Sequence, residues 1–201
     1  MVLVTGPTGS GKTTTLYAAL TELNSPEKKI ITVEDPVEYR LPGINQVQVH
    51  EKIDLSFERV LRSALRQDPD IILVGEMRDQ MTAEIGMRAS ITGHMVLSTL
   101  HTNDVISTPI RLLDMGVPRY MVALSLQMVV AQRLVRVICE NCGEAHSPSP
   151  AEHEWLKYEL ADKVDAYSYK RGSGCSQCNG TGYTGRTGVY EVLEMTNDLV
   201  E

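Results

Sequence analysis

One stretch near the start of the chain, residues 6–13, constrains the fold more than any other part of the sequence. It reads GPTGSGKT and matches the phosphate-binding P-loop pattern GxxxxGK[ST]. The apolar, β-branched run 2–5 before it is typical of a buried strand, and residues 14–23 after it predict an amphipathic helix. A strand, a glycine-rich loop and a helix in this order predict an α/β fold built on a P-loop core.

The residues of this loop have expected roles in holding a nucleotide. Glycines let the loop curl so that its backbone N–H groups point at a phosphate, and the N-terminus of the following helix adds a positive dipole. Lys12 is placed for the β- and γ-phosphates and Thr13 for a magnesium ion. The expected nucleotide-binding residues are Gly6, Pro7, Thr8, Gly9, Ser10, Gly11, Lys12, Thr13 and Thr14. The alternative is a chance glycine-rich turn. The strand expected before the loop and the helix expected after it argue against that alternative.

Three further apolar runs each lead to a residue capable of chemistry. Residues 30–33 end in Glu34, residues 71–75 lead to Glu76 in a Walker B pattern, and residues 95–100 end in His101. The carboxyl ends of parallel strands form the ligand-binding edge of an α/β sheet, so we expect these side chains at one edge. Glu76 is the first choice to position or deprotonate the attacking water and Glu34 the alternative, and both are candidate magnesium partners with Thr13. His101 is a candidate sensor of the γ-phosphate.

Four arginines are candidates for stabilising charge within or between subunits. Arg78 follows Glu76 closely enough to reach the same site, and we place it with the catalytic candidates. Arg62 and Arg66 lie on the polar side of a helix expected over residues 56–66, and Arg111 lies in a helix expected to start at Asn103. A solvated helix face is the alternative interpretation for Arg62 and Arg66.

The sequence also predicts the elements that follow the Walker B run. We expect a helix over residues 82–92 with Thr82 as its N-cap, and a helix from Asn103 to residue 115. A third helix is expected from residue 117 to about residue 132, with an extended segment over residues 134–138.

Four cysteines form two C-x-x-C pairs, Cys139 with Cys142 and Cys175 with Cys178. Each pair fits a tight knuckle, and two knuckles supply the four thiolates of a tetrahedral structural zinc site. Reduced thiols, redox pairs and an iron–sulfur cluster stay open as alternatives. His146 could replace one ligand, although we treat it as part of a polar surface excursion between the pairs.

Composition limits the remaining possibilities. The net charge of −7 gives no overall attraction to nucleic acid, and no apolar run approaches the roughly 20 residues that cross a bilayer. We therefore expect a cytosolic protein that does not bind nucleic acid.

The expected domains are a P-loop core over residues 1–138, a cysteine lobe over 139–188 and the start of a further portion over 189–201. The abrupt ends suggest a piece of a longer protein.

Seven sequence segments together resemble the ATPases of type II secretion and type IV pilus assembly. They are residues 6–17, 32–38 (TVEDPVE), 66–70 (RQDPD), 75–79 (GEMRD), 92–94 (TGH), 98–103 (STLHTN) and the paired C-x-x-C. In that family, residues 32–38 correspond to an acidic box, residues 71–79 to Walker B and residues 98–103 to a histidine box. The cysteine lobe resembles the zinc-binding element of its secretion and pilus-extension members, which favours assembly over retraction.

The resemblance implies a RecA-like motor that hydrolyses ATP with Mg²⁺ and works as a homohexamer. Such motors act at the cytoplasmic face of the inner membrane, where they push against an integral-membrane platform protein and drive pilins into a fibre or pseudopilus. The family's N-terminal regions and the end of its motor domain are absent from this sequence, so we expect weak nucleotide binding and slow turnover. A nucleic-acid-dependent ATPase of the RecA or helicase kind, and a non-catalytic nucleotide switch, are the alternatives.

Overall fold

The structure, a computed structural model, describes residues 1–200; Glu201, the last residue of the expected 189–201 portion, lies outside the described residues. The chain forms two compact units, which are described separately. The core unit comprises Met1–Arg133 and the segment from Gly188 onward, and the cysteine unit comprises Leu134–Thr187. The domain limits expected from the sequence, at residues 138 and 188, remain predictions.

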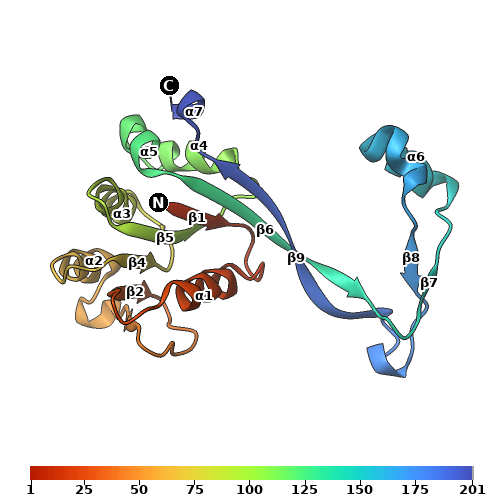
Figure 1. Ribbon diagram of the computed structural model, residues 1–201, viewed down its shortest axis with the longest axis horizontal. Coiled ribbons are helices and arrows are strands. Elements are labelled where there is room, and N and C mark those ends of the chain that lie inside the picture. The colour runs from red at the N-terminus through yellow and green to blue at the C-terminus, as the bar shows by residue number, and fades with distance from the viewer. Residues whose placement is uncertain (201) are drawn as a thin grey trace. The chain divides into compact units, whose positions relative to one another are not determined.

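The core unit contains a seven-stranded sheet in the order β3-β2-β4-β5-β1-β6-β9 (Figure 1). The strands from β3 to β6 in this order pair in parallel, and β1 lies between β5 and β6. Parallel order places all their carboxyl ends at one edge. The strands are β1 (Val2–Thr5), β2 (Ile30–Glu34), β3 (Asn45–Gln48), β4 (Ile71–Val74), β5 (Met95–Leu100), β6 (Met128–Ile138) and β9 (Tyr183–Glu194).

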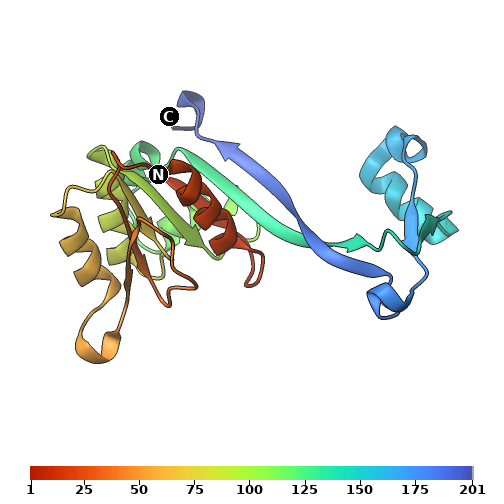
Figure 2. The same ribbon diagram turned by 60° about the horizontal axis from the view of Figure 1, so that its bottom comes forward.

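Helices cover both faces of this sheet, as Figure 2 shows. On one face, α1 (Lys12–Leu23) packs Leu16 and Leu20 against Val4 and Leu73. The opposite face is covered by the other helices of the core, which are α2 (Phe57–Leu65), α3 (Gln80–Ile91), α4 (Ser107–Asp114) and α5 (Arg119–Ser125). Neighbouring residues of each strand alternate between the two faces, so the strands are apolar on both sides. A short η1 (Glu51–Ile53) precedes α2, and α7 (Asn197–Val200) follows β9.

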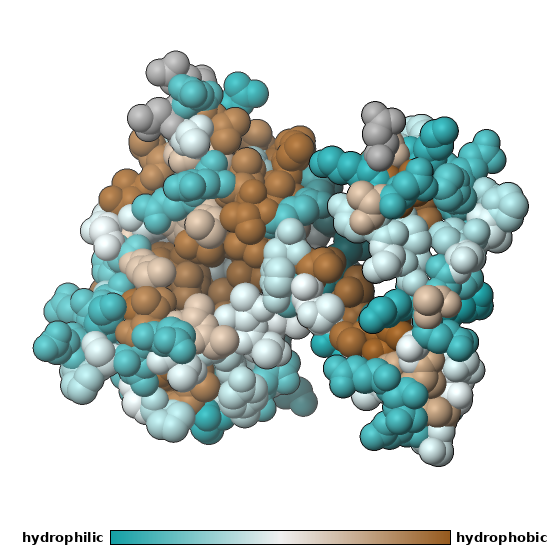
Figure 3. Space-filling model, turned by 45° about the vertical axis from the view of Figure 1, so that its right-hand side comes forward, coloured by the Kyte–Doolittle hydropathy of each residue, from teal (hydrophilic) through white to brown (hydrophobic). Residues whose placement is uncertain are grey.

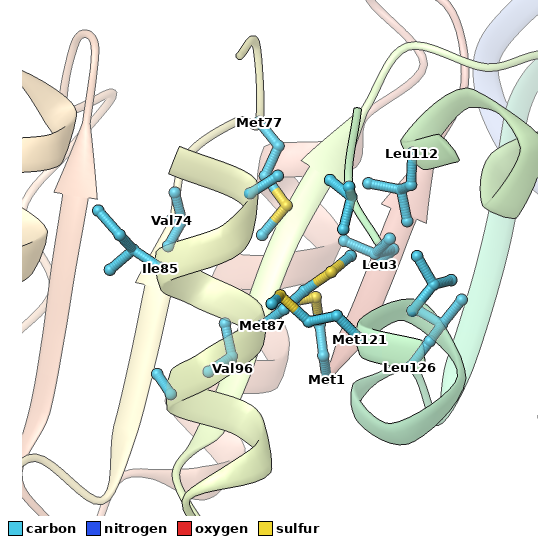
Figure 4. Close-up of a cluster of buried hydrophobic side chains, with 14 of the residues drawn as sticks. Met1, Leu3, Val74, Met77, Ile85, Met87, Val96, Leu112, Met121 and Leu126 are labelled. Atoms are coloured by element: carbon cyan, nitrogen blue, oxygen red, sulfur yellow. The ribbon is translucent and has the colours of Figure 1, made fainter. Parts of the chain in front are cut away.

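The larger core cluster is aliphatic and rich in methionine (Figure 4). Met87 and Met121 lie between α3, α5 and the sheet, beside Leu3 and Val96, and each is at most 2% exposed. Unbranched, flexible methionine side chains fill irregular gaps between layers. The α/β P-loop core with a separate tetracysteine lobe, expected from the sequence, is confirmed.

Three expectations about local structure are wrong. The helix expected over residues 117–132 ends at Ser125, and β6 begins at Met128. Thr82 does not cap α3, because the Asp79 carboxylate accepts the bond from the Thr82 backbone N–H at 2.8 Å. Asn103 does not start α4 either, since Asp104 accepts from the Ser107 N–H at 2.7 Å. Aspartate is a stronger N-cap than threonine, whereas α4 begins at Ser107 after Ile106, whose side chain makes no cap bond.

The cysteine unit is built from short elements. The strands β7 (Gly143–Ala145) and β8 (Lys170–Gly172) form an antiparallel pair, and between them lie α6 (Pro150–Leu160) and η2 (Ala161–Ala166). A turn of 3-10 helix, η3 (Ser176–Cys178), carries the second cysteine pair. Residues 151–170, expected as a polar excursion, begin with a helix because Ser149 and Glu152 form a capping box and Pro150 is its first residue. Along the described residues, no helix has both the length and the apolar character to cross a bilayer.

Candidate nucleotide and metal sites

The P-loop follows β1 and enters α1 through backbone conformations that favour glycine. Gly6, Gly9 and Gly11 have φ angles of 138°, 78° and 86°, and Gly11 occupies the N-cap of α1. A Cβ on Gly6 would stand 2.3 Å from the backbone oxygen of Gln132. Glycine is therefore required at residue 6 for close approach as well as for its φ angle.

Lys12 is the first residue of α1, and its side chain turns back toward the start of the P-loop. Its Nζ donates to the Gly6 carbonyl at 2.9 Å and to the Pro7 carbonyl at 3.1 Å, and the residue is buried. Burial lowers the pKa of Lys12 from its ordinary value, and the negative charge of Glu76 opposes that shift. The ammonium group is thus held at the mouth of the loop in the electrostatic range of the Walker B carboxylate.

Two features of this region fit a phosphate group. No side chain caps the N-terminus of α1 and no acidic residue lies in its first turn, so the helix dipole and first N–H groups are left for an external acceptor. The hydroxyl oxygen of Ser10 is buried without a hydrogen-bond partner among the described residues. Unpaired buried polar atoms are rare in native proteins, and here a bound anion would satisfy them.

A cluster of charged side chains lies at the carboxyl edge of β4 and β5. Glu76 is mostly buried, pairs with Arg78 through one oxygen, and faces the Nε2 of His101 at 3.7 Å through the other. Arg78 also reaches Asp35 at 3.8 Å. Below them, the Thr99 hydroxyl donates to the Gly75 carbonyl at 2.7 Å and fixes the turn that carries Glu76. Three predicted residues, Glu76, Arg78 and His101, therefore come together.

Glu34 lies in a separate, buried network on the face of the sheet that α1 covers. It is 3% exposed. Its carboxylate accepts from the hydroxyls of Tyr17 and Thr32 and from the Gln46 amide at 3.3 Å. Gln46 also donates to the Tyr17 oxygen at 3.3 Å. Burial and then the Glu34 carboxylate raise the pKa of the Tyr17 hydroxyl well above its ordinary value. The structure does not join the Glu34 side chain to the Glu76 cluster.

The remaining candidate arginines lie away from these contacts. Arg62 pairs with Glu58 one turn earlier on α2 at 3.0 Å, and Arg66 donates to the Ser63 hydroxyl at 3.2 Å. Arg111 is an exposed residue of α4. Within residues 1–200, no hydrogen bond or ion pair joins any of the three to the P-loop or to Glu76. Their role at a subunit contact remains a prediction.

Sequence reasoning missed Gln132, which contacts the P-loop from β6. Its amide donates to the Ser10 carbonyl and accepts from the Thr15 hydroxyl, both at 2.7 Å. Gln132 was placed at the end of the helix expected over residues 117–132, where no contact with the P-loop was foreseen. The β-branched pair Val129 and Val130 was the signal for a strand in the sequence.

The four cysteines of the cysteine unit converge as the sequence predicts. All four sulfur atoms lie within 4.8 Å of one another, and three of their separations are 3.9 Å (Cys139 to Cys175), 3.8 Å (Cys142 to Cys178) and 3.7 Å (Cys175 to Cys178). A disulfide requires about 2.05 Å. Four thiolates about 2.3 Å from a central zinc ion stand about 3.8 Å apart at tetrahedral angles, so the sulfur spacing fits such an ion.

Backbone and side-chain N–H groups point at these sulfur atoms. Cys178 Sγ accepts from the backbone N–H of Cys175 and of Gly182, both at 3.2 Å, and Cys175 Sγ accepts from the Asn141 amide at 3.3 Å. The two backbone bonds lower the pKa of the Cys178 thiol to about 6, with the Cys175 N–H as the largest cause. Such donors stabilise thiolates, the form in which cysteine binds metal.

Comparison with known proteins relates the whole chain to one group. A family model described as "Type II/IV secretion system protein" matches residues 1–201. The chain is 50% identical over 201 residues to the type II secretion system ATPase E of Vibrio cholerae, covering all of this chain and 39% of that protein. It is 52% identical over 206 residues to the type IV pilus assembly ATPase PilB of Myxococcus xanthus, covering all of this chain and 36% of that protein.

Solved structures agree with these sequence relatives. The ADP-bound pilus retraction motor PilT superimposes with a TM-score of 0.70 at 34% identity, covering 99% of this chain and 48% of that one. The Legionella pneumophila ATPase DotB gives a TM-score of 0.66 at 25% identity, over 99% of this chain and 46% of that one. The chain thus spans 39% and 36% of the two curated relatives and less than half of these two solved chains.

Proposed function

This chain belongs to the type II/IV secretion system protein family, and from that premise we propose that it is the nucleotide-hydrolysing core of a motor ATPase. The motor powers assembly of a type IV pilus or of a type II secretion pseudopilus. The observation that carries the proposal is the position of Glu76. It lies at the same sheet edge as the P-loop, near enough for its charge to influence Lys12, and it is grouped with Arg78 and His101.

Each residue then has a defined task. The loop backbone, the open N-terminus of α1 and Lys12 bind the phosphates of ATP, and ADP remains after hydrolysis. Glu76 orients the water and accepts its proton, with Glu34 as the alternative base. Arg78 stabilises developing charge, and His101 reports the γ-phosphate to the next element. Magnesium neutralises phosphate charge when bound, and Thr13 with Glu76 or Glu34 would hold it.

The cysteine unit has a structural task in this proposal. Cys139, Cys142, Cys175 and Cys178 would hold one Zn²⁺, and the closed set of four thiolates leaves no open position for catalysis. When bound, the ion would cross-link two chain segments that are far apart in sequence. The same cysteines favour assembly over retraction, and a pilus assembly ATPase is among the relatives.

The oligomer and its partners follow from the family. We propose a homohexamer that works at the cytoplasmic face of the inner membrane against an integral-membrane platform protein. Figure 3 shows apolar side chains, in brown, gathered on the face of the core unit turned toward the viewer. Large exposed apolar patches mark protein contacts, which supports an assembly. The exposed large apolar residues of α4, α5 and β9, with Ile106 just before α4, are Ile106, Ile110, Tyr120, Leu124, Val189, Tyr190 and Val192.

ATP hydrolysis by the purified full-length protein tests the proposal directly. We expect Glu76→Gln to retain ATP binding and to lose nearly all turnover, because the amide cannot accept the proton of the water. Lys12→Ala should lose binding. Glu22→Gln near the end of α1 is the matched control, since it makes the same change at an exposed carboxylate away from the site, and it should hydrolyse ATP normally.

Three outcomes would change the proposal. Normal turnover in Glu76→Gln would move the base to Glu34, and Glu34→Gln then decides it. Turnover that rises strongly with added DNA would favour the nucleic-acid motor instead. A protein that binds ATP but does not hydrolyse it, in the hexameric state and with Mg²⁺ present, would indicate a nucleotide switch.

A further inference from the structure

We propose that Gln132 is a positioning residue for the P-loop, and that its side-chain amide holds the loop in the shape that receives phosphate. The inference rests on the proposed nucleotide site and adds a residue outside the four motifs that define that site. Gln132 lies on β6, outside the P-loop pattern, and its side chain is uncharged. No direct contact between Gln132 and the nucleotide is required.

The first support is the pair of hydrogen bonds made by one amide. Gln132 Nε2 donates to the Ser10 carbonyl at 2.7 Å, and Gln132 Oε1 accepts from the Thr15 hydroxyl at 2.7 Å. Ser10 lies between two glycines of the loop, and Thr15 lies at the end of the first turn of α1. The amide therefore links the flexible part of the loop to the helix that follows it.

The chemistry of the two partners fixes the orientation of the amide. A backbone carbonyl only accepts hydrogen bonds, so the NH₂ group must face Ser10 and the amide oxygen must face the Thr15 hydroxyl. Gln132 is 3% exposed, and water therefore cannot easily replace either bond. Loss of this amide would leave the Ser10 carbonyl, in a residue that is also 3% exposed, without this donor.

The second support is the fit of the Gln132 backbone against the loop. Thr5 pairs with Ala131 in the register of β1 and β6, so Gln132 follows on β6 as Gly6 follows on β1. The Gln132 carbonyl oxygen would stand 2.3 Å from a Cβ on Gly6. One residue thus contacts the loop at its start through its backbone and at its centre through its side chain.

The effect on nucleotide binding follows from these contacts. The loop contains three glycines at positive φ, and such residues have more freedom than others when they are not held. A loop that fluctuates must be ordered when phosphate binds, and that ordering weakens affinity. Gln132 removes part of the fluctuation before binding. It therefore contributes to affinity for ADP and ATP, rather than to the chemical step.

The test is Mg-ADP binding by the full-length protein in Gln132→Met. Methionine keeps a similar length and volume but cannot donate to Ser10. We expect Kd for Mg-ADP to rise at least about ten-fold, the equivalent of one or two hydrogen bonds, with kcat at saturating ATP changed less than about three-fold. Gln127→Met is the matched control, because Gln127 is exposed just before β6, and its Kd should match the wild type.

A second pair of variants tests the same contact from α1. Thr15→Val removes the hydroxyl that donates to Gln132 and should raise Kd about five-fold. Thr21→Val is its control, since Thr21 donates to the Tyr17 carbonyl on the same helix, away from the loop. The double variant of Gln132 and Thr15 should bind no more weakly than Gln132→Met alone, because both changes break one linkage.

The outcomes separate this inference from the proposed function. A wild-type protein that fails to bind Mg-ADP refutes the nucleotide site itself. A wild-type protein that binds it, with Gln132→Met unchanged in Kd but lowered in unfolding temperature, refutes positioning and leaves only a packing role. Should Gln132→Met fail to fold, Thr15→Val decides alone, and a wild-type Kd there overturns the inference.

Discussion

Arg78 pairs with Glu76 at the carboxyl edge of the sheet and extends to Asp35 at the end of β2. The guanidinium group thereby ties the ends of β4 and β2 together across the site. The hydrogen bond to Glu76 raises the pKa of Arg78, and the guanidinium keeps its charge at any relevant pH. Glu76 is thus held in one orientation by a partner that cannot lose its proton.

Removal of Arg78 should therefore slow hydrolysis more than it weakens binding. We expect Arg78→Ala to lower kcat for ATP at least about ten-fold, because the Glu76 carboxylate loses its orientation and the transition state loses a cation. Arg59→Ala is the matched control, since Arg59 makes an exposed ion pair with Asp54. Equal kcat values in wild type, Arg78→Ala and Arg59→Ala would remove Arg78 from the mechanism.

The buried network around Glu34 should contribute measurably to stability. Tyr17→Phe keeps the ring, which is 1% exposed, and deletes the hydroxyl that donates to the carboxylate. We expect a loss of about 1–3 kcal/mol in the free energy of unfolding at pH 8, because a buried charged acceptor loses a donor. Tyr39→Phe is the control, because the Tyr39 ring packs edge-on against Tyr17 and its side chain is 53% exposed. A loss in Tyr39→Phe as large as in Tyr17→Phe would contradict this assignment.

The same network predicts a loss of stability in alkaline solution. The pKa of Tyr17 is raised in the folded protein, so its contribution is fully present below the unfolded value of 10.0 and is lost as the pH rises above it. Urea unfolding of the wild type at pH 8 and pH 11 should show this decline, and Tyr17→Phe should decline less. Parallel declines in the two proteins would argue that other groups are responsible.

The close approach at Gly6 predicts an unequal cost for two alanine substitutions. Gly6→Ala adds a Cβ that collides with the Gln132 oxygen, whereas a Cβ on Gly9 has no atom within 4 Å. Both residues have positive φ, a conformation that disfavours alanine at either position. We expect Gly6→Ala to be destabilised by about a further 1–3 kcal/mol. Equal unfolding midpoints for the two variants would show that β6 yields to the added methyl group.

The cysteine unit should contain one zinc ion per chain. Metal analysis of protein purified without chelator should give about one Zn²⁺, and Cys178→Ser should bind it more weakly and expose the unit to proteolysis. Ser176→Ala, which alters the same turn without touching a sulfur atom, is the control. A wild-type protein with iron instead of zinc, or with no metal and a resistant cysteine unit, would overturn the zinc assignment.

The sequence predicted the strands and the edge residues well because their signals are local. Buried parallel strands are short apolar runs, and both the P-loop and Glu76 follow such runs directly. The first half of β6 was missed, although its second half was expected as the extended segment 134–138. The apolar residues from Met121 to Val130 continue across the end of α5, and periodicity alone does not separate a helix from a buried strand there.

The contacts of the site were harder to predict than its members. Glu34 and Glu76 end neighbouring strands and were expected to act together, yet the Glu34 side chain contacts Tyr17 and Gln46 instead. Tyr17 lies on α1 and Gln46 on β3. The way these elements pack against β2 depends on the tertiary structure, which the sequence pattern does not reveal. The cysteines converged as predicted because metal-ligand spacing is itself a local signal in each pair.

The contact between Gln132 and Ser10 joins residues that are 122 positions apart. On a ribosome, the P-loop emerges long before the strand that holds it, and β1 must wait for β5 and β6 on its two sides. Late, long-range pairing of this kind slows folding. A nascent chain that stops before β6 would carry every residue of the P-loop pattern and still lack the strand that shapes it, so nucleotide would bind that chain more weakly than it binds the folded core.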